Sequence, residues 1–264
     1  MARAPFTYPF CYTPAPDIVA AAKRLICFLD SPSGSWGPEN FASLIPPTAS
    51  QRVPPVHEAT GGHGFPPPTA TSASLKEGKM LGVLKVEDDK GDIDYLYAFS
   101  GTVGGRATLP GFVPPIYDLT EPEGYFRRRE AEISAMPAGP ERSAASAELQ
   151  AWIFDRYRVS NARGETLSIR EVFARRGLIP PGGTGDCAAP KLLQYAYDHK
   201  LTPIAMGEFW YGASPASEVR QQGCFYPSCT GKCGPLLSFM LEGLEVEANP
   251  LDREYTTDTE PRML

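Results

Sequence analysis

Three cysteines in the last third of the chain have types and spacing that suggest chemistry: Cys187, Cys229 and Cys233. Each lies where we expect a helix to begin, and the positive end of a helix lowers the pKa of a thiol and favours the thiolate. Thiolate is the form that binds zinc, and we expect Cys229 and Cys233, four positions apart, to share one helix face. The sequence therefore predicts one zinc ion on three sulfurs, completed by water, Asp186 or Cys224.

The same cysteines have an ordinary interpretation as small buried hydrophobic side chains, as free cysteines often are. We favour metal ligation because Gly, Pro and Asp neighbours are unusual for core cysteines. His57 and His63 fall in a Pro-rich stretch. We expect both imidazoles to be solvated rather than to bind the metal.

Composition limits the compartment and the partners. The chain of 264 residues has a formal net charge of −6, which argues against broad binding to nucleic acid. The local basic clusters, Arg127-Arg128-Arg129 and Arg175-Arg176, are expected mainly as solvated helix faces. We find no secretion signal and no apolar stretch long enough to cross a membrane, so we expect a cytoplasmic protein with reduced thiols.

The elements that must position the cysteines follow from periodicity and turn residues. We expect an α/β or α+β fold, a mixed sheet with flanking helices. Strands are predicted over 80–86, 93–99, 202–209 and 244–247, the first two as a hairpin around Gly91. Helices are predicted from an N-cap at Asp17 and over 126–135, 145–157, 169–176, 187–199 and 229–242. The expected organisation is an aromatic arm and helix (1–30), a Pro/Gly-rich loop (31–76), the main domain (77–250) and a flexible tail (251–264).

Cysteines at the starts of two successive helices resemble the zinc-dependent deaminase superfamily, where a His or Cys opens one helix and Pro-Cys-x-x-Cys opens the next. The second motif here, Pro227 to Cys233, is longer than that pattern. The resemblance implies a cytidine-deaminase-like fold and a proton-relay Glu two residues after the first ligand. Ala189 stands at that position. Asp186 and Glu208 are the candidate replacements, and their ordinary interpretations are a helix N-cap and a solvated strand end.

A second resemblance covers most of the chain. Its strongest blocks are GDCAAPKLLQYA (185–196), MGEFWYG (206–212) and FYPSCTGKC (225–233). Further blocks are FTYPF (6–10), GKMLGVL (78–84), AFSG (98–101), VPPIYDL (113–119) and NARGE (161–165). These strings resemble the N-terminal region of long bacterial RluA-type RNA pseudouridine synthases. The family's catalytic half, with its Arg-Leu-Asp motif, would begin after about residue 260, and the segment at 251–253 is not that motif.

The resemblance implies a zinc-binding accessory domain that helps present RNA to a pseudouridine synthase catalytic domain, in cis or in trans, and carries no synthase site itself. The alternatives are a zinc-dependent nucleobase deaminase or related hydrolase, and a structural zinc domain for protein contacts. Aromatic and basic residues near the cysteines are candidates for stacking on bases and contacting phosphates. They are Lys191, Trp210, Tyr211, Arg220, Tyr226 and Lys232, and core packing is the ordinary interpretation of the aromatic ones.

Overall fold

The computed structural model of the protein describes residues 4–31, 74–121 and 123–251. The loop predicted over 31–76, with His57 and His63, and the tail predicted over 251–264 lie almost wholly outside these residues. Along the chain the named elements are α1 (Pro16–Asp30), β1 (Lys79–Glu87), β2 (Ile93–Phe99), α4 (Tyr125–Ala135), α5 (Pro140–Arg156), β3 (Arg158–Ser160), β4 (Thr166–Ser168), α6 (Ile169–Ala174), α7 (Ala188–Asp198), β5 (Thr202–Tyr211), β6 (Phe225–Tyr226) and α8 (Thr230–Met240). Helices combined with a sheet confirm the predicted class.

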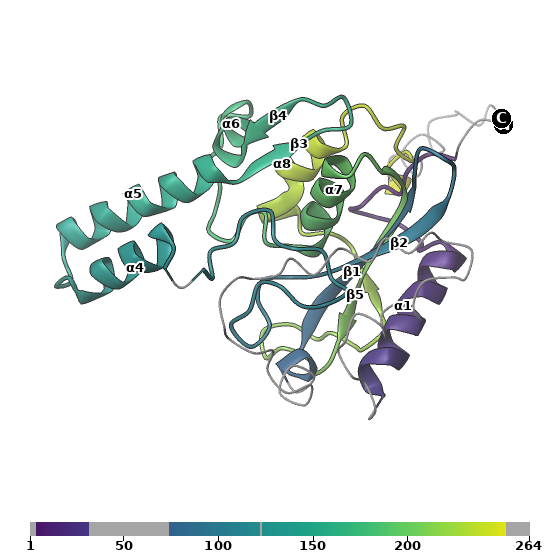
Figure 1. The fold of residues 1–264 in the computed structure, drawn as a ribbon, viewed down its shortest axis with the longest axis horizontal. Helices are drawn as coiled ribbons and strands as arrows, with labels where there is room; N and C mark the ends of the chain where they lie inside the picture. Colours follow the sequence, from purple (N-terminus) through teal and green to yellow (C-terminus); the bar gives the residue numbers. More distant parts are fainter. Residues whose placement is uncertain (1–3, 32–73, 122, 252–264) are drawn as a thin grey trace, which may run out of the picture.

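A four-stranded sheet in the order β2-β1-β5-β6 forms the centre of the molecule (Figure 1). Its ladders are antiparallel, and β3 and β4 form a separate two-stranded hairpin. A parallel pairing occurs at the isolated bridge between Phe6 and Val246, where the sequence predicted a strand over 244–247. The likeness to a cytidine deaminase stays a prediction.

Two hydrophobic clusters cover the two faces of this sheet, because successive strand residues point to opposite sides. Leu84, Val86 and Met206 pack with α7 and α8 in one cluster, whereas Leu81, Val83 and Phe209 pack with α1 in the other. Covering both faces explains why the central strands are continuous apolar runs rather than strictly alternating ones.

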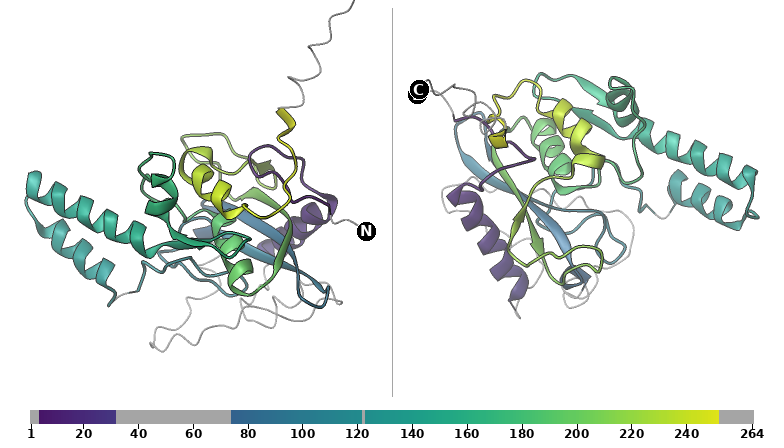
Figure 2. Two further views of the ribbon diagram at one scale, coloured as in Figure 1. Left: turned by 90° about the horizontal axis from the view of Figure 1, so that it is seen from above. Right: turned by 180° about the vertical axis from the view of Figure 1, so that it is seen from behind.

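The helices α4 and α5 form a hairpin that projects from the body, as all three views show (Figures 1 and 2). A small cluster of Ile133, Ala145 and Leu149 holds the two helices together. The sequence predicts a later start for the second helix because Pro137-Ala138-Gly139-Pro140 indicates a helix break. Proline is compatible with the first helical turn, and Pro140 begins α5.

Two local predictions differ from the structure. The helix α1 begins at Pro16 after Ala15, and the Asp17 carboxylate pairs with Lys85 at 2.6 Å instead of capping the helix. The β3–β4 hairpin was not predicted because each strand has only three residues, too few for a periodic pattern. A search of the described residues for a helix with the length and hydrophobicity of a membrane span finds none.

Candidate functional site at the N-terminal ends of α7 and α8

A buried carboxylate joins the beginnings of α7 and α8. Glu208 lies on β5 and is 3% exposed. Its Oε1 accepts a hydrogen bond from the backbone N–H of Ala189, in the first turn of α7, at 3.2 Å. Its Oε2 accepts one from the hydroxyl of Ser228, just before α8, at 2.5 Å. The Glu208 carboxylate therefore binds the N-terminal ends of two helices. The ordinary interpretation of Glu208, a solvated strand end, is not what the structure shows.

The sheet register places this carboxylate. Glu208 pairs with Gly82 on β1, and both positions face α7. A Cβ at Gly82 would lie 2.8 Å from Leu192 and 2.9 Å from Ala188, so only glycine lets α7 approach this closely. The carboxylate thus reaches Ala189, the position at which the deaminase resemblance leads one to expect a glutamate side chain.

Burial raises the pKa of Glu208, while the hydrogen bonds from Ser228 and Ala189 and the charge of Arg220 oppose that shift. The helix end favours a negative charge, and desolvation favours the neutral acid. A carboxylate with both oxygens engaged and almost no exposure has little access to a substrate. This arrangement supports a positioning role in the fold better than proton relay to a bound molecule.

The cysteines do not form the predicted metal centre. Within residues 4–31, 74–121 and 123–251, no group of three or more His, Cys, Asp or Glu side chains is arranged to hold a metal ion. The zinc prediction on Cys187, Cys229 and Cys233, with Asp186 or Cys224 as a fourth ligand, is therefore wrong. All of these cysteines are free, and Cys224 lies exposed near Gln221.

The geometry of the α8 N-terminus explains the error. Cys229 is the N-cap, with φ −60° and ψ 119°, so it is outside the helical conformation. The rule that residues four apart share a helix face needs both of them to be helical. Cys229 is exposed, and its sulfur accepts a hydrogen bond from the Lys232 N–H, whereas Cys233 is buried.

Cys187 is the N-cap of α7 and packs against the cluster that contains Cys233. A hydrogen bond with the Cys233 thiol, followed by burial, raises the pKa of Cys187. Glu208 and Asp186 act in the same direction, because nearby negative charge disfavours a thiolate. The sequence predicted the opposite direction from the helix end alone. A thiol of this kind is a poor nucleophile.

Asp186 and Lys191 hold the chain around the start of α7. The Asp186 carboxylate accepts a hydrogen bond from the Tyr157 hydroxyl at 2.8 Å, and Cys187 takes the N-cap position that was one interpretation of Asp186. The ammonium of Lys191 donates to the carbonyl oxygens of Phe99 and Gly101, each at 3.0 Å. Burial lowers the pKa of Lys191 to about 8.

Two of the predicted RNA contacts, Lys191 and Tyr211, are buried in the structure. Lys191 is 3% exposed, and Tyr211 is fully buried with its hydroxyl hydrogen-bonded to Asp30 at 2.8 Å. Neither side chain reaches the surface.

The other candidates are Lys232 and a cluster beside β6 in which Arg220 contacts both Trp210 and Tyr226. The guanidinium of Arg220 lies over two aromatic rings, 5.6 Å from the centroid of Trp210 and 4.5 Å from that of Tyr226. Its Nε and Nη2 donate to Glu218, and its Nη1 is buried without a hydrogen-bond partner. Lys232 is exposed in the first turn of α8. We call Trp210, Arg220, Tyr226 and Lys232 the β6 surface.

Comparison with protein-family models, with curated proteins and with solved structures found no match. The resemblances to pseudouridine synthases and deaminases therefore stay predictions from the sequence.

Two residues of the site were not predicted. Ser228 and Tyr12 both bind Glu208, the first through its carboxylate and the second through its backbone N–H at 2.8 Å. Tyr12 also donates to the Tyr226 carbonyl, which ties the N-terminal arm to β5 and β6. Ser228 has one sequence signal: it precedes the N-cap of a predicted helix.

Proposed function

We propose that this chain is an accessory module of RNA pseudouridylation that contacts RNA through the β6 surface and performs no uridine chemistry itself. Many strings along the chain resemble RluA-type synthases, and this resemblance supports a role in RNA pseudouridylation. These 264 residues contain no Arg-Leu-Asp motif, and this supports a non-catalytic role in that reaction. The partner in this proposal is a synthase catalytic domain.

The observation that carries the RNA role is the contact of Arg220 with two aromatic rings, Trp210 and Tyr226. Trp210 and Tyr226 are both half-buried, so part of each ring reaches the surface. Aromatic faces and arginine planes are the groups on which proteins stack unpaired bases. Stacking also fixes the Arg220 side chain, which reduces the entropy lost when it binds a ligand.

Because the chain has a negative net charge, contact with RNA is expected only at a limited part of its surface. A net charge of −6 repels a polyanion on average, and phosphate contacts depend on individual Lys or Arg residues. Lys232 is the exposed cation of the β6 surface, close in sequence to Tyr226. We expect it to contact phosphate while the aromatic residues contact bases.

Fluorescence anisotropy tests this function. It measures the binding of labelled single-stranded and stem-loop RNAs at several salt concentrations. We expect salt-sensitive binding that both Arg220→Gln and Lys232→Gln weaken. Lys232→Gln should also reduce the salt slope by about 0.7 for single strands, whereas Arg220→Gln, which removes a charge already paired with Glu218, should leave the slope nearly unchanged. Lys90→Gln is the matched control, because it removes one exposed charge in the β1–β2 turn. Binding that does not depend on salt, or that weakens equally in the control, contradicts the proposal.

The alternatives do not gain comparable support. The deaminase or hydrolase and the structural zinc domain both required a metal on the three cysteines, and the ligand geometry contradicts that centre.

A further inference from the structure

Exposed arginines gather on α6, on the β3–β4 hairpin and on the last turn of α5. These elements lie together, with α6 and the hairpin between α5 and α8 (Figure 1). Between residues 155 and 176 the sequence has six arginines, no lysine and three carboxylates, so this segment has a net charge of +3 in a chain of net charge −6. We call the six exposed side chains the arginine surface: Arg156, Arg158, Arg163, Arg170, Arg175 and Arg176.

The carboxylates of this segment neutralise the arginine surface only in part. Three of its members have a carboxylate partner, and the pairs are Arg170–Asp155, Arg175–Glu165 and Arg158–Glu171. The partners in these pairs are about half exposed, and exposed ion pairs contribute little energy, so a phosphate can replace the carboxylate. Within the described ranges, Arg156, Arg163 and Arg176 have no carboxylate oxygen within 4.0 Å. Glu242, just after α8, also acts on Arg175, and an excess of positive charge remains.

Aromatic rings hold two members of the arginine surface in place. The guanidinium of Arg156 lies 5.2 Å from the ring centroid of Trp152 on α5. The guanidinium of Arg175 lies 5.5 Å from the ring centroid of Phe239 on α8. Such contacts restrict a long side chain before any ligand arrives, which reduces the entropy lost on binding.

The segment that carries these arginines offers charge without rings on which bases could stack. It has two aromatic residues, Tyr157 and Phe173, and both are buried. Proteins hold single-stranded RNA mainly by stacking its bases, whereas they recognise double-stranded RNA by its shape and its phosphates. Guanidinium groups suit phosphates because their planar donors bind two oxygens at once. A base-paired segment therefore fits this surface better than unpaired bases do.

The helix α8 connects the arginine surface with the β6 surface. Lys232 lies in its first turn, and Phe239, the residue that Arg175 contacts, lies seven positions later. Seven positions correspond to about two turns and a rise of about 10 Å, and they return to the same side of a helix. One RNA can therefore reach both surfaces.

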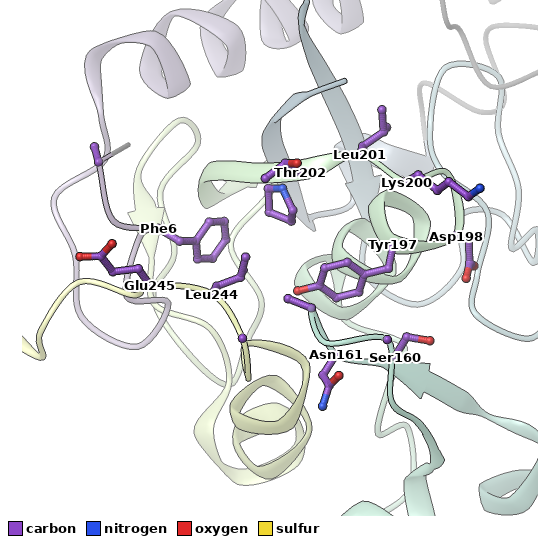
Figure 3. Close-up of a pocket in the computed structure, with 15 residues that line it drawn as sticks. Phe6, Ser160, Asn161, Tyr197, Asp198, Lys200, Leu201, Thr202, Leu244 and Glu245 are labelled. Carbon is purple, nitrogen blue, oxygen red and sulfur yellow. The ribbon is translucent and has the colours of Figure 1, made fainter. Parts of the chain in front are cut away.

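Negative side chains border the arginine surface at the β3–β4 turn. Figure 3 shows Asn161, in this turn, beside a cavity that Asp198 and Glu245 also line. The two carboxylates point outward on opposite sides of the cavity. They repel a polyanion there, so its path is restricted to the arginines.

We infer that the arginine surface holds the phosphate backbone of a base-paired RNA segment whose unpaired neighbours stack at the β6 surface. This inference rests on the proposed RNA function and narrows its substrate class to stem-loops. A single strand would use the β6 surface alone, and a stem without a loop would use the arginine surface alone.

Three labelled RNAs test the inference on the full chain by fluorescence anisotropy: a stem-loop, its loop sequence as a single strand, and its stem as a blunt duplex. The test variant combines Arg156→Gln, Arg163→Gln and Arg176→Gln, so that no ion pair of the fold is lost. We expect it to bind the stem-loop and the duplex about tenfold or more weakly, with a salt slope lower by up to about 2.7, at about 0.9 for each duplex phosphate contact. Its binding of the single strand should stay unchanged.

Two controls separate this contact from net charge and from folding. The combination of Lys23→Gln, Lys76→Gln and Lys90→Gln removes the same charge from exposed positions elsewhere, and it should leave all three affinities within about twofold because salt screens distant charges. Lysine at the three arginine positions of the test variant keeps the charge and should restore most of the salt slope.

Stem-loop affinity that is unchanged in the glutamine variant, or that falls equally in the lysine-to-glutamine control, overturns the inference. Binding of the single strand, and its weakening by Lys232→Gln, test the proposed function separately, because that strand uses the β6 surface alone. Polyglutamate that displaces the stem-loop better than unlabelled duplex does at equal charge identifies an acidic protein segment as the ligand and also overturns the inference.

Discussion

The Ser228 hydroxyl donates to the Glu208 carboxylate at 2.5 Å, and through this bond the beginning of α8 is tied to the central strand β5. The other oxygen of the same carboxylate binds the first turn of α7. One side chain thus fixes how two helices lie on one face of the sheet.

Replacement of Glu208 should therefore destabilise the fold in proportion to what is removed. We expect Glu208→Ala to lower the free energy of unfolding by about 2–4 kcal/mol, since it leaves a cavity and two unpaired donors. Glu208→Gln keeps the shape and one acceptor and should cost about 1 kcal/mol. Urea denaturation measures both, with the exposed Glu148→Ala as control. Equal effects of the two Glu208 variants contradict the bridging role.

Close packing of α7 on β1 gives a second prediction. Gly82→Ala should lower stability by about 1–3 kcal/mol, because its methyl group meets Leu192 and Ala188 below 3.0 Å. Gly231→Ala in the first turn of α8 meets nothing within 4 Å and should be neutral or stabilising by up to about 1 kcal/mol. Thermal unfolding distinguishes the two, and a destabilised Gly231→Ala would contradict the open position.

How far the sequence predicts this structure depends on the range of the interactions. The hairpin of β1 and β2, and the helices α7 and α8, were predicted within a few residues because periodicity and turn residues are local signals. The sequence offers Glu208 only as a candidate proton relay at a strand end, on the strength of the deaminase resemblance. The sequence does not predict the hydrogen-bond partners of Glu208. Ala189 and Ser228 lie 19 and 20 positions away from it, and only the sheet register brings these residues together.

Burial of Lys191 should appear in the pH dependence of stability. Its pKa is about 8 in the folded protein against an ordinary 10.5, so the unfolded chain holds more protons in this range. Stability contributed by this position therefore rises with pH between these values, by about 3 kcal/mol in total. Lys191→Met should lack the rise, as judged from denaturation at pH 8 to 9.5 relative to the wild type. An exposed lysine, Lys90→Met, should leave the rise intact.

The thiols should differ in their reaction with a disulfide reagent. Cys229 is exposed, whereas Cys187 is half-buried with a raised pKa and Cys233 is buried. Reaction needs an accessible thiolate, so Cys229→Ser should remove one equivalent from the fast phase and Cys187→Ser none. The absorbance of the released thiolate follows both phases. A fast Cys187 would show that its environment lowers the pKa instead.

The pairing of Phe6 with the segment at Val246 places the two ends of the described fold side by side. A circular permutant that connects these ends through a short linker, and opens the chain at the exposed tip between α4 and α5, keeps every ladder of the sheet. In the unpermuted chain, a second domain fused before Phe6 would leave the fold from nearly the same place as one fused after Val246, so either order of fusion should suit this fold equally well.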